Sequence, residues 1–146
     1  MKHLNLEIAS DLGDISLMAV AVHALSTYAG LSPDVASLVE LSIVEAVTNA
    51  IKHAYRGRPD QKLLLAISLD EEQLQFDLYD FGDPMPAIQV DRLVRGHGIV
   101  EANYPDHTSI PETGRGLEII HRAMDTISYV REAGQNHLML TIRRGS

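Results

Sequence analysis

The chain has 146 residues, 45% of them hydrophobic, and it carries 12 basic against 20 acidic residues, which gives a formal net charge of -8 at pH 7. This length and hydrophobic content predict one globular domain over residues 1–146, and the negative charge argues against direct binding of nucleic acid. The absence of cysteine excludes disulfides, thiol catalysis and cysteine-ligated metal. No apolar run reaches the roughly 18 residues needed to span a bilayer, and the first residues lack the features of a signal peptide. We therefore expect a cytoplasmic protein with no membrane partner.

The first part of the chain predicts one strand followed by two helices. Apolar and polar residues alternate over residues 3–9, which is the period of a half-buried strand. Asp14 can then cap a helix over 15–30, which ends at a glycine. A second helix is predicted over 33–55, because Ser32 is a preferred N-cap residue and a proline follows it at the first helical position.

The second part of the chain contains four more predicted strands and one long helix. In chain order these elements are strands 62–70 and 74–80, a long segment 82–114 with at most short helices, a helix 115–126, and strands 127–132 and 137–144. This order predicts an α/β (α+β) two-layer sandwich, in which a mixed, mostly antiparallel sheet carries its helices on one face. A long irregular segment inside a small domain usually has a function, and we expect it to lie over the helices and cover a ligand.

A row of polar residues lies along the predicted second helix. Glu45, Asn49 and His53 are spaced by four, so they form a stripe along one edge of the apolar arc that faces the sheet. That arc consists of Val39, Ile43, Ala46, Val47, Ala50 and Ala54. Any one of the three polar residues alone is most simply an ordinary residue at a helix boundary, but three at this spacing favour a functional site.

Two glycine-containing motifs add to this row. Asp80 stands at the end of a predicted strand, where its carboxylate can accept a hydrogen bond from a ligand amine, and Gly82 permits a close approach of the backbone. Gly114 and Gly116 precede or open a helix, where free backbone N–H groups favour an anion such as phosphate. Each motif alone is also compatible with a simple turn, so only their combination is specific.

In order, Glu-x-x-x-Asn on a helix, Asp-x-Gly after a strand and Gly-x-Gly-Leu opening a later helix resemble the N, G1 and G2 boxes of the GHKL ATPase superfamily. The resemblance extends from about residue 4 to residue 143. The versions "ELSIVEAVTNAIKHAY", "DFGDPMP" and "GRGLEIIHRAMDTISY" look most similar to the anti-sigma factor serine kinases of bacterial partner-switching systems. The resemblance implies a Bergerat-type ATP-binding fold, with ATP and Mg²⁺ as cofactors.

The resemblance also implies roles for the residues of the N box. Asn49 would ligate Mg²⁺ through its side-chain oxygen, and the metal would bridge the ATP phosphates. Glu45, one turn earlier, would be the catalytic base that takes the proton from an incoming serine hydroxyl. His53 would hold the helix edge and the neighbouring loop by hydrogen bonding.

The other two boxes would hold the two ends of the nucleotide. Asp80 would accept a hydrogen bond from the adenine amino group, and Gly82 would leave room for the purine. The phosphates would be bound by residues of the G2 box, which are Gly114, Arg115, Gly116 and Leu117. Two departures from the family pattern, Pro84 in the G1 box and Thr113 before the G2 box, put the lid over the site in doubt.

The family implies a sigma factor as one partner and a STAS-type anti-sigma factor antagonist as the other, with phosphorylation of a serine of the antagonist. It also implies a homodimer, and we expect the strand within residues 3–10 and the first helix to form the dimer contact. Three alternatives stay open. The chain could be a nucleotide-dependent binding module with little or no kinase activity, a scaffold whose polar row is only structural, or a detached histidine-kinase catalytic domain.

Overall fold

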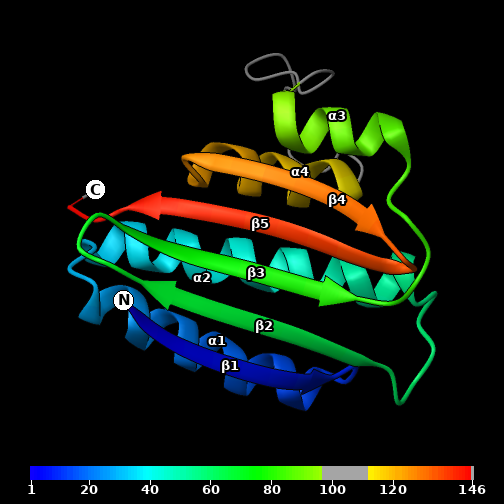
Figure 1. The fold of residues 1–146 in the computed structure, drawn as a ribbon, viewed down its shortest axis with the longest axis horizontal. Coiled ribbons are helices and arrows are strands. Elements are labelled where there is room, and N and C mark those ends of the chain that lie inside the picture. Colours follow the sequence, from blue (N-terminus) through cyan, green and yellow to red (C-terminus); the bar gives the residue numbers. More distant parts are fainter. Residues whose placement is uncertain (97–111, 146) are drawn as a thin grey trace.

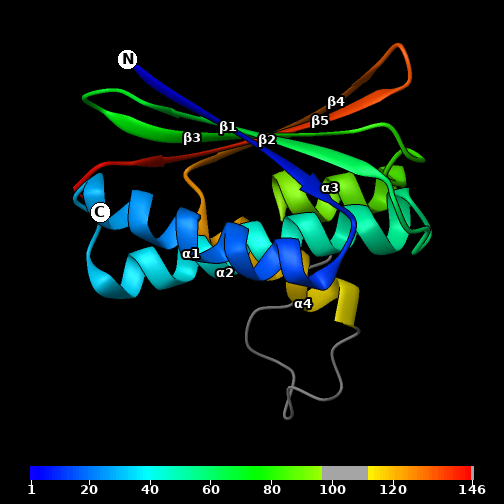
Figure 2. The ribbon, with the colours of Figure 1, turned by 90° about the horizontal axis from the view of Figure 1, so that it is seen from below.

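The computed structural model of the chain describes residues 1–96 and 112–145 and contains a five-stranded sheet (Figure 1). The strand order is β1-β2-β3-β5-β4, and each of the four neighbouring pairs is antiparallel. Figure 2 shows the helices on one side of this sheet and no helix on the other. The predicted two-layer α+β sandwich is therefore confirmed, with a sheet that is antiparallel at every pairing of the described residues rather than mixed.

The elements match the predicted order. They are β1 (Lys2–Ala9), α1 (Leu12–Tyr28), α2 (Pro33–Asn49), η1 (Ala50–Ala54), β2 (Lys62–Leu69), β3 (Gln73–Asp80), α3 (Ala87–Arg95), α4 (Glu112–Ala123), β4 (Thr126–Glu132) and β5 (Gln135–Arg143). The helix α3 is one of the short helices expected in the segment 82–114, and the part of that prediction which covers residues 97–111 lies outside the described residues. No helix of the described residues is both long enough and apolar enough to cross a membrane.

The first helix begins three residues earlier than predicted, and a different aspartate caps it. Asp11 is extended and its side chain accepts a hydrogen bond from the backbone N–H of Asp14 at 2.9 Å. The side chain of Asp14 instead accepts from the backbone N–H of Ala9 at 2.9 Å. The prediction that Asp14 caps the helix was therefore wrong. Two carboxylates three residues apart can each act as the N-cap, and only the fold shows that Asp14 instead binds the backbone at the end of β1.

The second helix begins as predicted but ends in a wider turn. Ser32 accepts from the backbone N–H of Val35 at 3.3 Å, and proline occupies the first helical position. After Asn49 the backbone continues as the π-helix η1, whose wider turn is closed by a hydrogen bond from Tyr55 N to Ala50 O at 2.9 Å. Single π-turns inside or after α-helices are rare and occur frequently at functional sites. Here the π-turn separates Asn49 from His53 in the predicted polar row.

The core lies between the sheet and the helices. Every apolar residue of the predicted arc of the second helix is buried. The inner face of the sheet follows the alternation of its strands, since Phe76 in β3 stands between Ile67 in β2 and Leu140 in β5, and all three are almost fully buried. The same register places Asp80, the last residue of β3, directly opposite Asn136 in β5. One end of the inner face is thereby polar.

Candidate functional site

A pocket lies at this polar end of the inner face, between α2, β3 and α4. Four of the residues predicted for the site line it, namely Asn49 at the end of α2, His53 in η1, Asp80 at the end of β3 and Leu117 in α4. Its walls are mainly apolar and include Leu78, Met85, Leu93, Ile120, Tyr129 and Leu138. The cavity volume is about 50 Å³, so the pocket as it stands is much smaller than the roughly 300–1,000 Å³ of typical ligand sites.

Glu45 and Gly116 meet beside this pocket rather than inside it. A methyl group built on Gly116 would stand 2.6 Å from Glu45 Oε2 and 3.7 Å from Asn49 Nδ2. The helix α4 therefore approaches α2 closely at this point, and the side chains of the N box lie against the glycine of the G2 box. Gly116 belongs to the second turn of α4, which begins at Glu112, so it is not at the open end of the helix as the sequence suggested.

Two other residues predicted for the G2 box, Gly114 and Arg115, lie near the start of α4. Gly114 lies in the first turn of α4, where backbone N–H groups have no partner within the helix. Arg115 follows it and is half-buried. The first turn of α4 is therefore the part of this helix that can present backbone donors to an anion.

Gly82 is buried because the backbone of η1 lies against it. A methyl group at this position would stand 2.3 Å from the carbonyl oxygen and 2.8 Å from the Cβ of Ala54. The next residue, Asp83, donates its backbone N–H to the same carbonyl oxygen at 2.8 Å. The need for glycine here is explained by packing between η1 and the loop after β3, whereas the sequence analysis assigned it to room for a ligand.

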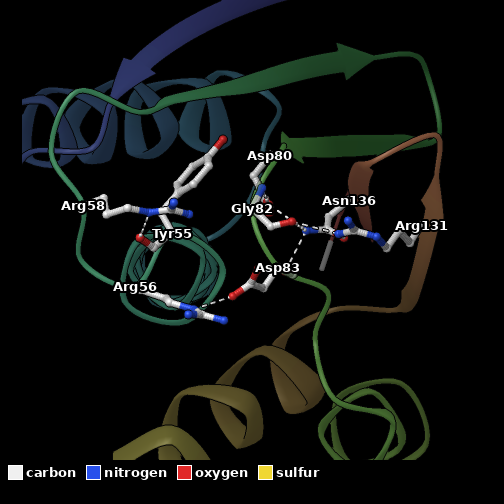
Figure 3. Close-up of polar contacts among 8 residues, drawn as sticks. All are labelled: Tyr55, Arg56, Arg58, Asp80, Gly82, Asp83, Arg131 and Asn136. Carbon is white, nitrogen blue, oxygen red and sulfur yellow. Dashed lines mark hydrogen bonds and ion pairs between the residues drawn. The ribbon is translucent and has the colours of Figure 1, made fainter.

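Two further residues attach this loop to the end of η1 (Figure 3). The buried Tyr55 accepts from the backbone N–H of Phe81 at 2.9 Å and donates its hydroxyl hydrogen to the carbonyl oxygen of Lys62 at 2.5 Å. Arg56 donates to the carboxylate of Asp83 at 2.6 Å. The loop that follows Asp80 is thus fixed from the side of η1.

Asp80 itself is buried, with an exposed fraction of 7%. Its Oδ1 accepts from the backbone N–H of Gly82 at 3.0 Å and from Asn136 Nδ2 at 2.7 Å. Burial raises the pKa of this carboxyl group, and the hydrogen bonds from Asn136 and Gly82 and the charge of Arg131 partly oppose that rise. A carboxylate in such a place costs free energy unless a partner stabilises its charge.

Asn136 was missed by the sequence analysis, which began the last strand at residue 137. The strand actually begins at Gln135, and Asn136 is buried on the inner face of the sheet. The signal was present in the alternation, because Asn136 has the same parity as the buried Leu138 and Leu140. A polar residue at a core position of a strand indicates a buried hydrogen-bond network.

The described residues contain no group of three or more His, Asp or Glu side chains that could hold a metal ion. Mg²⁺ does not need such a group, because it is commonly bound by one or two protein oxygens together with substrate phosphates and water.

Comparisons with known proteins agree with the geometry. The sequence model of a family described as "Histidine kinase-like ATPase domain" matches residues 8–142. The chain is 30% identical over 134 residues to an anti-sigma F factor from Halalkalibacterium halodurans, covering 88% of this chain and 83% of the relative. It is 25% identical over 137 residues to the serine-protein kinase RsbW from Bacillus cereus, covering 93% of this chain and 82% of the relative.

The fold also has solved counterparts. A chain in the crystal structure of the SiaB-SiaC complex from Pseudomonas aeruginosa superposes with a TM-score of 0.66 at 17% sequence identity, covering 95% of this chain and 88% of that one. At this identity the likeness shows the shared fold alone.

Proposed function

Because the chain belongs to the histidine kinase-like ATPase family, we propose that its pocket binds ATP with Mg²⁺ and that the chain transfers the γ-phosphoryl group to a serine of a partner protein. The observation that carries this proposal is the convergence of three distant motifs. Asn49 and Asp80 line one pocket, and Gly116 lies against the side chains of Asn49 and Glu45. The similarity to relatives named anti-sigma F factor and serine-protein kinase supports the same reaction.

The buried end of the pocket suits the adenine base. Asp80 can accept from an exocyclic amino group, a hydrogen bond to a charged group that is worth roughly 1.5–3 kcal/mol, and the apolar walls suit an aromatic ring. A purine does not fit into about 50 Å³. Binding therefore requires the walls of the pocket to move apart, and Met85 in the loop after β3 and Leu93 in α3 are two of the side chains that line it.

The other end of the pocket suits the phosphates and the metal. The amide oxygen of Asn49 can ligate Mg²⁺, and the backbone N–H groups in the first turn of α4 can donate hydrogen bonds to phosphate. These groups fit an Mg²⁺ ion held by one protein oxygen, ATP phosphates and water. When bound, Mg²⁺ supplies charge neutralisation for the transferring phosphoryl group. Gly114 and Arg115 would contribute donors to the phosphates from α4.

Glu45 is proposed as the catalytic base. Its carboxylate takes the proton from the serine hydroxyl while the serine oxygen forms a bond to the γ-phosphorus, and the bond from that phosphorus to the bridging oxygen breaks to release ADP. Such general-base assistance is typically worth about 10²- to 10⁴-fold in rate. A helix position next to Asn49 gives the base a fixed distance from the metal ligand.

Calorimetric titration of the purified protein with MgATP tests the binding step. We expect binding in the wild type that is lost in EDTA and strongly weakened in Asn49→Ala, whereas Thr48→Ala, next to it on α2, should bind normally. Absence of both heat and thermal stabilisation with wild type and MgATP would refute the proposal and favour a scaffold.

A second candidate function is a nucleotide-dependent binding module without kinase activity. The observation that favours it is that Glu45 does not line the pocket, although Asn49 and Asp80 do. Incubation with labelled ATP and each purified STAS-domain protein of the source genome separates the two functions. Phosphoserine that requires Glu45 and the acceptor serine supports the kinase, and ATP binding without phosphoserine on any acceptor selects the binding module.

For partners, we propose a sigma factor and a STAS-type antagonist with a phosphoacceptor serine, in the cytoplasm and with residues 1–146 acting as one domain. The support is the similarity to relatives named anti-sigma F factor. The net charge of -8 suits a basic protein surface such as the DNA-binding face of a sigma factor. Co-purification with sigma factors of the same genome, in ATP and in ADP, tests this pairing.

We also place a homodimer contact on β1 and α1. β1 is an edge strand that pairs only with β2 among the described strands, and Leu17 and Val20 of α1 are exposed by 73% and 66%. An unpaired edge next to an exposed apolar stripe is suited to a second copy of the same surface. Light scattering should show a monomer for Leu17→Glu, and an unchanged dimer for Val130→Glu, which places the same charge on an exposed apolar residue of β4 at the opposite edge of the sheet. A fully dimeric Leu17→Glu would refute this placement.

A further inference from the structure

The side chain of Asn136 joins three segments at the buried end of the pocket (Figure 3). Its amide nitrogen donates to Asp80 Oδ1 at 2.7 Å and to the carbonyl oxygen of Asp83 at 2.9 Å, with the carbonyl oxygen of Gly82 at 3.3 Å. Asn136 is 2% exposed, so these hydrogen bonds have no competition from water. A single amide therefore ties β5 to the end of β3 and to the loop after it.

The oxygen of the same amide is fixed from β4. Asn136 Oδ1 accepts from the hydroxyl of Tyr129 at 2.9 Å and from Arg131 Nη1 at 2.9 Å. Tyr129 in turn accepts from the backbone N–H of Met85 at 2.7 Å, and Arg131 also donates to the carbonyl oxygen of Gly82 at 2.8 Å. Two donors face the amide oxygen and only acceptors face the nitrogen, so a reversed amide would lose its bonds on both sides.

This arrangement makes the two oxygens of Asp80 unequal. Both hydrogen bonds that Asp80 accepts fall on Oδ1. No buried side-chain oxygen or nitrogen atom of the described residues is without a hydrogen-bond partner, and Asp80 lines the pocket. Oδ2 is therefore the oxygen of Asp80 that is left as an acceptor for a ligand in this pocket.

We propose that Asn136, held in place by Tyr129 and Arg131, is a positioning residue that turns Asp80 into a one-oxygen acceptor and so sets the selectivity of the pocket for a base with an exocyclic amino group over a base with a carbonyl oxygen. This inference rests on the proposed function, because it needs a nucleobase at Asp80. It adds a residue of β5, outside the three motifs, that determines which base binds.

The charge of Asp80 gives the inference a second consequence. Burial raises the pKa of this carboxyl group and the hydrogen bond from Asn136 lowers it, so removal of Asn136 should shift the pKa upward. A protonated Asp80 becomes a donor, which suits a carbonyl oxygen rather than an amino group. The other ionisable groups around Asp80 come from η1 and its end, from the following loop and from β4; they are His53, Tyr55, Asp83, Tyr129 and Arg131.

The test measures the affinities of the full chain for MgATP and for MgITP, whose base has a carbonyl oxygen in place of the amino group of adenine, by calorimetry from about pH 5 to pH 8. The variants are Asn136→Ala, Asn136→Thr, which keeps one hydroxyl donor, and the control Gln135→Ala on the opposite face of β5. We expect Asn136→Ala to bind MgATP about ten- to a hundredfold more weakly, with a smaller preference over MgITP. As the pH is lowered, the affinity of Asn136→Ala for MgATP should begin to fall at a higher pH than that of the wild type. The fall for Asn136→Thr should occur at an intermediate pH.

Several outcomes would overturn the inference. Asn136→Ala with wild-type selectivity and pH profile would do so, and so would an equal loss of both nucleotides with an unshifted pH profile, because that result marks a merely structural role. If Asn136→Ala does not fold, Tyr129→Phe carries the test, since it removes one donor to the amide and should shift selectivity in the same direction. If the wild type binds neither nucleotide, the proposed function itself is refuted. If the wild type binds MgATP and the variants bind it equally well, only the role of Asn136 is refuted.

Discussion

Replacing Gly82 with alanine separates packing from ligand binding in the G1 box. The new methyl group would lie 2.3 Å from the carbonyl oxygen of Ala54, 2.4 Å from its carbonyl carbon and 2.8 Å from its Cβ. Backbone atoms of η1 cannot rotate away, so the loop must move, at a cost of about 1–3 kcal/mol for overpacking. Loss of the hydrogen bond from Asp83 N to Ala54 O adds about 0.5–1.5 kcal/mol. Loss of chain entropy in the unfolded state offsets about 0.4–1 kcal/mol, which leaves a net destabilisation of about 0.5–4 kcal/mol.

Urea denaturation of Gly82→Ala and the wild type measures this difference. Gly13→Ala is a milder comparison, because its methyl group would meet only Oδ1 of Asp11 at 3.3 Å, and that oxygen, which caps α1, needs to shift by only a few tenths of an ångström. That variant should lose much less stability than Gly82→Ala. An unfolding free energy of Gly82→Ala within about 0.5 kcal/mol of the wild type, which is the usual scatter of harmless surface substitutions, would refute the packing argument. Loss of MgATP binding in such a stable variant would restore the view that Gly82 only makes room for the base.

Two further predictions concern the neighbouring motifs. In Gly116→Ala the helix α4 should gain about 0.5–1 kcal/mol, while the methyl group, 2.6 Å from Glu45 Oε2, displaces that flexible carboxylate. We therefore expect unchanged or higher thermal stability together with at least tenfold slower serine phosphorylation, and a clear loss of stability would contradict this reasoning. For Asp80, burial raises the pKa, so over the interval between the ordinary and the raised value the folded protein keeps a proton that the unfolded chain has released. The free energy of unfolding should fall as the pH rises through this interval, and the fall should be absent in Asp80→Asn. Equal pH dependence of both proteins in denaturant titrations would show that Asp80 does not titrate in this way.

The fold could be predicted from the sequence because its signals are local. The strand from Gln73 to Asp80 alternates in polarity, and Ser32 before a proline fixes the start of α2. The boundaries of the strands differ from the predicted ones by one or two residues, as expected where turns rather than core residues decide them. The two-layer arrangement then follows from the order of the elements and from their apolar faces.

The details of the site depend on tertiary contacts that no local pattern contains. Nothing in residues 50–54 signals a π-turn, and its last residue, Ala54, contacts Gly82 and Asp83, nearly thirty residues away. The role of Asn136 depends in the same way on its register opposite Asp80. The motifs indicated which residues gather at the pocket, but not which of them pack, which position a neighbour and which face a ligand.

These roles can be separated by asking what each residue does for the fold alone. Gly82 has a packing reason, since the backbone of Ala54 occupies the space where a side chain would be. Asp80 has no such reason. Its burial disfavours the ionised form, and an apolar residue at the end of β3 would pack against the same walls without that cost. This fold keeps a carboxylate there and adds Asn136, Gly82 and Arg131 to stabilise its charge. It is less stable than it would be with an apolar residue, which is expected where a residue serves a function. Asp80 is therefore the residue of the pocket whose presence argues most directly for a ligand with a hydrogen-bond donor.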